Sequence, residues 1–170
     1  MNKTALALSG LAILYFSTPL VADVHVKFIE GAPKDRFEIL NFGTCDLEAA
    51  DLTIDFAASN AGLIFDVTNS GAGVEVFQPF EVTAGAQYLR SLPTISDGDQ
   101  RATLSMIGLE RNETIAFTID VDDTNGSREI TVTDGEIRGA KVSLVSNNVE
   151  YSAIIGSNSK AIINTAFCDA

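Results

Sequence analysis

The sequence predicts an all-β protein, an antiparallel β-sandwich of the jelly-roll or immunoglobulin-like kind, in one domain. Short segments of alternating apolar and polar residues recur at intervals of about 8–12 residues, with Gly-, Asn- and Pro-containing turns between them. No stretch after residue 22 shows the 3.6-residue period of an amphipathic helix. Ten phenylalanines and many Ile and Val residues supply one core, and burying each such side chain contributes about 1.5–3 kcal/mol. The absence of Trp excludes the Trp-centred core of antibody domains.

The first 22 residues predict a cleaved secretory signal peptide. A basic start at Lys3 precedes an uncharged apolar run over 4–16, and Pro19 and Ala22 then provide a break and a small residue. The apolar run is too short to span a bilayer comfortably. We therefore expect residues 1–22 to be removed, residues 23–170 to form the β-sandwich domain, and the mature protein to have no membrane span. It would be secreted, periplasmic or at the cell surface.

The strands follow from the alternation, taken in chain order. Residues 24–29 (VHVKFI) alternate, a turn around Pro33 follows, and Phe37 and Ile39 point inward from the next strand. Pro79 marks a strand that ends or lies at a sheet edge. A short helix near 46–51 is an alternative for that segment. We expect strands over 24–29, 36–40, 52–56, 63–67, 74–80, 87–92, 102–107, 114–122, 129–134, 140–145, 149–155 and 160–166.

The clearest structural signal is a hairpin over 114–136. Ile115, Phe117, Ile119 and Val121 alternate with polar residues, so one face of this strand should lie on the core and the other toward water. Asn125-Gly126 tolerates the positive φ angles of a tight turn. A returning strand over 129–134 would follow.

The same hairpin holds the densest group of carboxylates, which makes calcium the candidate cofactor. We expect Asp120, Asp122, Asp123 and Glu136 to converge at one end of the sandwich, because Ca²⁺ takes six to eight oxygen ligands from clustered carboxylates and carbonyls. The alternative is a solvated strand face with turn-forming Asp residues. The EF-hand pattern does not fit, since valines stand where it needs its first Asp and last Glu.

Two smaller acidic groups accompany the hairpin. Asp97 and Asp99 surround a glycine, and Asp66 and Glu75 flank the Gly-rich segment over 68–73. Their spacing alone does not assign them to an ion.

Charge and cysteine content limit the partners. The formal net charge is −12 and becomes one unit more negative once Lys3 is lost, which disfavours nucleic acid and anionic membranes. Cations, basic proteins and uncharged polysaccharides remain as extracellular partners. Cys45 and Cys168 predict one disulfide in an exported chain. The single histidine, His25, offers a poor base for thiol chemistry.

Catalytic patterns are weak. Glycoside hydrolysis needs two carboxylates across a sugar, and none of the 23 acidic residues forms a distinguishable pair. The G-x-S-x-G motif is absent, and zinc ligands are lacking. We therefore expect a non-catalytic protein.

Three segments resemble a known family: GLIFDVTNSGAGVEVFQPFEV at 62–82, FTIDVDDT at 117–124 and GEIRGAKV at 135–142. They resemble exported proteins of marine bacteria called aggregation factor core proteins, after the sponge cell-aggregation proteoglycan. The resemblance implies calcium-dependent adhesion or aggregation at the cell exterior on a β-rich scaffold. We expect an exported, non-catalytic binding or adhesion module. The alternatives are a structural subunit of a surface polymer or matrix, and a small carbohydrate-active enzyme.

Overall fold

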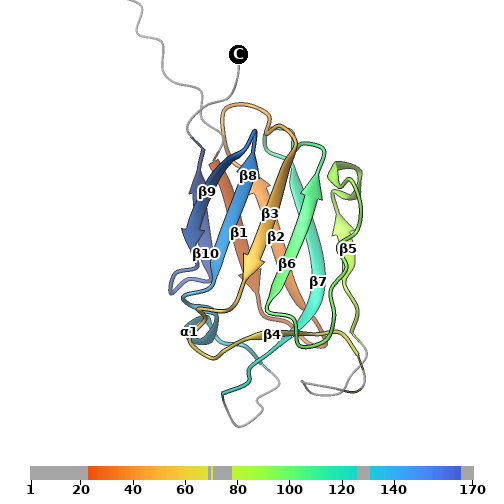
Figure 1. Cartoon of the computed structure of the whole chain (residues 1–170), viewed down its shortest axis with the longest axis vertical. Coiled ribbons are helices and arrows are strands. Elements are labelled where there is room, and N and C mark those ends of the chain that lie inside the picture. Colours follow the sequence, from red (N-terminus) through yellow and green to blue (C-terminus); the bar gives the residue numbers. More distant parts are fainter. Residues whose placement is uncertain (1–22, 69, 71–77, 126–130, 166–170) are drawn as a thin grey trace, which may run out of the picture.

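The computed structural model describes residues 23–68, 70, 78–125 and 131–165, and confirms the antiparallel β-sandwich (Figure 1). The predicted signal peptide lies outside these residues. Two sheets pack face to face in a single domain. Among the described residues, none of the helices has the length and apolar character needed to cross a membrane.

The larger sheet contains β1 (Asp23–Ile29), β2 (Asp35–Asn41), β4 (Ile64–Asp66), β5 (Glu81–Ala84), β7 (Thr114–Asp122) and β10 (Lys160–Asn164). The smaller sheet contains β3 (Ala50–Asp55), β6 (Arg101–Met106), β8 (Lys141–Ser146) and β9 (Val149–Ile154). The strand order is β10-β1-β2-β7-β4 in the larger sheet, with β5 beside β7, and β6-β3-β8-β9 in the smaller sheet. Two short helices complete the fold, η1 (Ala86–Tyr88) and α1 (Asp134–Ile137).

The core lies between the sheets because alternate residues of each strand face inward. On β2 and β7, Phe37 lies directly opposite Phe117. Both side chains are fully buried, and their rings stack with centroids 5.2 Å apart. On the smaller sheet, Leu52 of β3 is paired with leucines of β6 and β8 and is also fully buried. The predicted alternation therefore builds both layers of the core.

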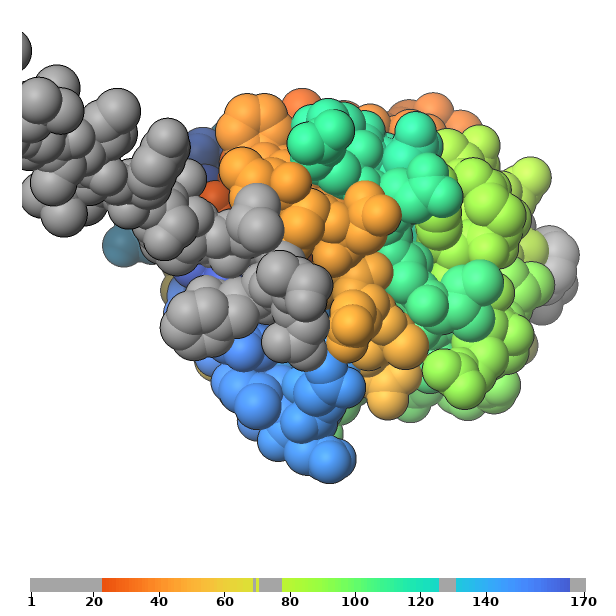
Figure 2. Space-filling model, turned by 90° about the horizontal axis from the view of Figure 1, so that it is seen from above, coloured from red at the N-terminus to blue at the C-terminus, as the bar shows by residue number. Residues whose placement is uncertain are grey.

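At one end of the sandwich, Asn41 connects the segment after β2 with the segment before β7. Figure 2 shows the orange and blue-green parts of the chain side by side at this end. The fully buried Asn41 side chain donates hydrogen bonds to the carbonyl oxygens of Cys45 and Leu109, each at 2.9 Å. Its own carbonyl oxygen accepts one from Gly43 N at 3.0 Å. Cys45 is partly buried against the core. Cys168 lies outside the described residues, so its pairing with Cys45 stays a prediction.

Three segments differ from the predicted secondary structure. The predicted strand over 87–92 is wrong, because η1 and an irregular segment occupy it. Gly85 precedes η1 with φ of 73°, and a Cβ there would lie 2.5 Å from Thr114 O, so the chain passes too close to β7 for a side chain. Of the predicted strand 74–80, residues 78–80 are not strand and β5 begins at Glu81; the rest lies outside the described residues. Leu47 pairs with Leu109, and no helix forms over 46–51.

The returning arm of the predicted hairpin is also absent where it is described. Residues 131–133 are not strand, and α1 begins at Asp134. Two causes explain this. Both edges of β7 are already paired, one with β2 and the other with β4 and β5. In addition, Thr133 and Glu136 form a capping box that satisfies the N–H groups of a helix start. Residues 126–130 lie outside the described residues.

Candidate metal centre

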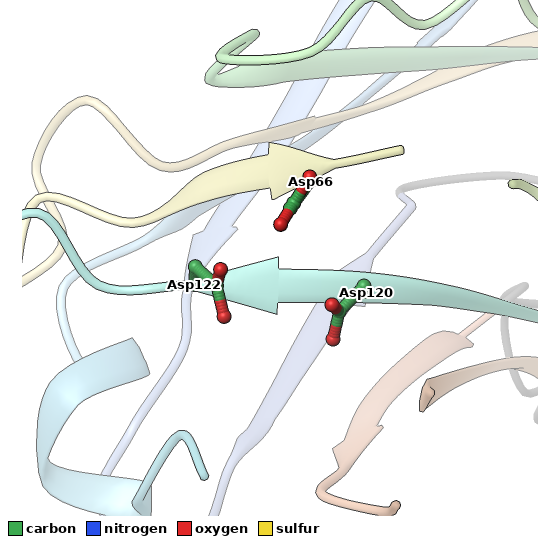
Figure 3. Close-up of side chains that lie close together, drawn as sticks. All are labelled: Asp66, Asp120 and Asp122. Carbon is green, nitrogen blue, oxygen red and sulfur yellow. The ribbon is translucent and has the colours of Figure 1, made fainter. Parts of the chain in front are cut away.

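Three aspartates converge where β4 meets the end of β7. Asp66 lies directly opposite Asp120 in the antiparallel pair, and Asp122 lies two residues further along β7. Their neighbours Phe65 and Val121 are paired with each other and belong to the core. Because side chains alternate along a strand, all three carboxylates project from the opposite face of the sheet. Figure 3 shows Asp66 extending from β4 toward β7, where Asp120 and Asp122 lie.

The three carboxylates are close together and almost fully buried. One oxygen from each lies within 4.8 Å of the others. The exposed fractions are 1% for Asp66, 5% for Asp122 and 9% for Asp120. Two ionised carboxylates at this separation repel by on the order of 3 kcal/mol at an effective dielectric constant of about 20. Burial removes the water that would reduce this repulsion, so the cluster needs a compensating positive charge or protons.

Asp66 is the residue with the strongest need of a partner. Both of its carboxylate oxygens are buried and accept no hydrogen bond from the described residues. Buried polar groups in proteins are normally hydrogen-bonded, and a charged one left unpaired is particularly costly. Asp66 thus presents two unpartnered oxygens at a point where two further carboxylates meet.

The electrostatics of the cluster favour binding of positive charge. Burial, together with the neighbouring carboxyls of Asp97 and Asp122, raises the pKa of Asp66 from 3.8 to about 7. Burial and the charge of Asp122 raise the pKa of Asp120 to about 6. Near neutral pH the Asp66 carboxyl therefore holds a proton for part of the time, and a cation could displace it.

A fourth acid borders the cluster from β2. Asp35, 3% exposed, accepts hydrogen bonds from Val121 N at 3.0 Å and from Gly31 N at 3.2 Å. β2 begins at Asp35, whereas β7 continues to Asp122. The Asp35 carboxylate thus takes the place of a strand carbonyl for Val121. Burial, reinforced by the charge of Asp120, raises the pKa of Asp35 to about 8 despite these hydrogen bonds.

The structure brings together two of the four residues predicted from sequence as calcium ligands. Asp120 and Asp122 belong to the cluster, whereas Asp123, the residue after β7, is not among the three grouped carboxylates. The Glu136 carboxylate accepts hydrogen bonds from Thr133 N at 2.7 Å and Thr133 Oγ1 at 2.8 Å, within the cap of α1. Asp66 was singled out only for flanking a Gly-rich segment. Its place in the cluster depends on the pairing of β4 with β7, which spacing along the chain does not reveal.

The donor set suits a hard divalent cation. Two oxygens bound at about 2.4 Å to one Ca²⁺ are at most about 4.8 Å apart, so one ion could contact all three carboxylates. Zinc prefers nitrogen and sulfur ligands. Mg²⁺ requires near-ideal octahedral geometry and usually retains several waters, which a site this buried accommodates poorly. Calcium is the cation that this arrangement fits best.

Comparisons with known proteins add no relative. The chain matches no protein-family model, no curated protein and no solved structure.

Proposed function

We propose that this protein is an exported, non-catalytic adhesion module whose β-sandwich is stabilised by a calcium ion held by Asp66, Asp120 and Asp122. The observation that carries the proposal is Asp66, whose two buried carboxylate oxygens accept no hydrogen bond from the described residues. Acidic clusters alone are common on protein surfaces. A 1%-exposed aspartate directed at two other carboxylates is costly unless a cation or proton compensates it.

Burial also bears on what the ion would do. A calcium ion that bridges two proteins, or that coordinates a sugar hydroxyl, must keep ligand positions open to solvent. The three carboxylates are at most 9% exposed, which favours a structural ion. Calcium would then support adhesion indirectly, by holding β4 against β7 and so preserving the surface that contacts a partner protein or polysaccharide. The same burial disfavours these carboxylates as the catalytic pair of a glycoside hydrolase, which must flank an open sugar site.

The test is thermal unfolding of the protein purified after export, in calcium and in EDTA. An ion that binds only the folded state stabilises it by RT ln(1 + [Ca²⁺]/Kd), or about 2.7 kcal/mol at a hundredfold excess over Kd. We expect calcium to raise the melting temperature of the wild type and of Glu113→Gln, but not of Asp122→Asn. Glu113 is an exposed acid before the opposite end of β7, so its variant controls for the lost charge. Identical melting in calcium and EDTA would refute the calcium site.

Adhesion itself is tested separately. Beads coated with the protein should aggregate in calcium and disperse in EDTA, and beads coated with Asp122→Asn should not aggregate. Calcium-dependent stabilisation without aggregation would support the ion but not adhesion.

A second candidate, a self-assembling subunit of a surface polymer, is favoured by exposed apolar side chains on and beside the end strands of the two sheets. Large apolar side chains on β8, β9 and β10 are 41–58% exposed, namely Val145, Val149, Ile154 and Ile162. β9 and β10 are also the end strands of their sheets, and end strands can pair with a second copy of the chain. This function predicts concentration-dependent assembly that persists in EDTA and is lost in Ile154→Lys. A monomer at all concentrations by analytical ultracentrifugation would exclude it.

A further inference from the structure

The turn formed by residues 96–99 packs against β4 on the edge that faces away from β7. Phe65 N donates to Asp99 O at 2.8 Å, and Gly98 N donates to Phe65 O at 2.9 Å. The turn therefore takes the position of a neighbouring strand for β4, which has only three residues. A segment so short gains most of its stability from what lies on either side of it.

Hydrogen bonds within the turn fix its shape. Asp99 N donates to Ser96 O at 3.0 Å, and Ser96 N donates to the Asp99 carboxylate at 2.7 Å. Gly98 has φ of 82°, a value that favours glycine. The Asp99 side chain is thus used inside the turn, whereas the side chain of Asp97 is directed outward to β4.

The Asp97 carboxylate lies beside Asp66 at the border of the three-aspartate cluster, and is not itself one of the three carboxylates grouped within 4.8 Å of one another. One of its oxygens accepts a hydrogen bond from Val67 N at 3.3 Å, directly after Asp66 in the chain. Asp97 also lies near enough to Asp66 for their carboxyl groups to interact directly and through their charges. Two ionised carboxylates cannot hydrogen-bond each other, because both only accept. A cation between them would turn this repulsive contact into an attractive one.

The number of carboxylate oxygens in the cluster also favours a further ligand. Calcium takes six to eight oxygens, and Asp66, Asp120 and Asp122 supply six only if every one of them binds through both oxygens. Ligands in proteins mix one- and two-oxygen binding. The carboxylate beside Asp66 would complete the set once the ion draws it to within about 4.8 Å of the other ligand oxygens.

We propose that Asp97 is a fourth ligand of the calcium ion, so that the ion joins the turn of residues 96–99 to β4 and β7. This inference rests on the proposed calcium site and extends it in one respect. Calcium then stabilises the short central strand β4 on both edges, through β7 on one side and through the turn on the other. Loss of the ion loosens the turn first, because the turn contacts β4 through two backbone hydrogen bonds, whereas β7 is also paired with β2 over six residue pairs.

The experiment measures calcium affinity by titration calorimetry on the exported protein and on Asp97→Asn, Asp122→Asn and Glu113→Gln. We expect at least a tenfold loss of affinity in Asp97→Asn and Asp122→Asn and none in Glu113→Gln. Terbium luminescence separates direct ligation from positioning. With a carboxylate ligand removed, water enters the vacated position, so emission should decay faster in H₂O relative to D₂O for Asp97→Asn than for the wild type.

Hydrogen exchange gives a second readout, local to the turn. The Gly98 and Phe65 amides should exchange more slowly in calcium than in EDTA in the wild type, and this difference should vanish in Asp97→Asn. Wild-type affinity in Asp97→Asn, or unchanged terbium decay, would overturn the fourth ligand while leaving the three-aspartate site standing. Absence of calcium binding to the wild type would overturn both proposals.

Discussion

Asp66 and Asp120 lie directly opposite each other on the paired strands β4 and β7, and neither is more than 9% exposed. Like charges in directly opposite positions destabilise a sheet, and burial increases the effect. A protein that needed only a stable strand pair would place apolar residues here. The pairing of two buried acids is therefore a cost to folding that a bound cation would offset, and it leads to measurable consequences.

The first consequence is an unusual dependence of stability on pH. In the folded protein the pKa values of Asp66, Asp120 and Asp35 are raised from 3.8 to about 7, 6 and 8. Between pH 3.8 and these raised values, the folded state binds more protons than the unfolded state, so the free energy of unfolding must fall as pH rises. In EDTA, we expect the free energy of unfolding to decrease by a few kcal/mol from about pH 5 to about pH 8.

Chemical denaturation at several pH values checks this, and calcium should oppose the decrease because it replaces the lost protons. Stability in EDTA that is flat or rises between pH 5 and pH 8 would contradict the raised pKa values.

The second prediction concerns Asp66→Asn. Asparagine removes one negative charge and adds two N–H donors that can reach the carboxylates of Asp120 and Asp122. In EDTA at pH 8, we expect this variant to be more stable than the wild type by about 1–3 kcal/mol. Calcium should add little to it, since a central ligand is gone. Thermal melts in both conditions give the comparison, with Glu113→Gln as the charge control. A variant that is less stable in EDTA yet still stabilised by calcium would show that Asp66 is not a ligand.

The third prediction separates the cap of α1 from the ion. Thr133→Ala removes the cap and should destabilise the protein by about 1 kcal/mol. Glu136→Gln keeps an oxygen that can accept from Thr133, so both stability and calcium affinity should remain near wild type. Calcium titration of the two variants tests this. If Glu136→Gln lost as much affinity as Asp122→Asn, Glu136 would be a ligand, as the sequence alone suggests.

Local patterns predict most of the sandwich. The period of two is carried by each strand itself, so segments such as 114–121 are identified without knowing their neighbours. The wrong predictions concern segments whose structure depends on which strand lies beside them. The returning arm after Asn125-Gly126 has good turn chemistry, but β4 and β5 already pair with the available edge of β7.

Some residues of the candidate site can likewise be predicted from the local sequence, and others cannot. Asp120 and Asp122 stand out because they alternate on one strand with core residues, which places them on one face. Asp66 joins them through the pairing of β4 with β7, and the turn of residues 96–99 places Asp97 beside Asp66. Both contacts connect residues more than 20 positions apart in the chain. No periodicity encodes such contacts. Burial was missed too, since alternation on β7 predicts that Asp120 and Asp122 face water, whereas both are buried.

The last prediction compares the substitution of a phenylalanine in the core with that of an exposed one. Phe117 is fully buried and stacked on Phe37, so Phe117→Ala should cost about 3–5 kcal/mol and Phe117→Leu considerably less. Phe42 is 61% exposed, and among the described residues its ring stacks on His25 alone, with ring centroids 5.0 Å apart, so Phe42→Ala should cost less than about 1 kcal/mol. Urea denaturation in constant calcium, at several protein concentrations, measures all three. If Phe42→Ala proved as destabilising as Phe117→Ala, and only at high protein concentration, Phe42 would be buried between two copies of the chain. The self-assembling subunit would then be favoured over the adhesion module.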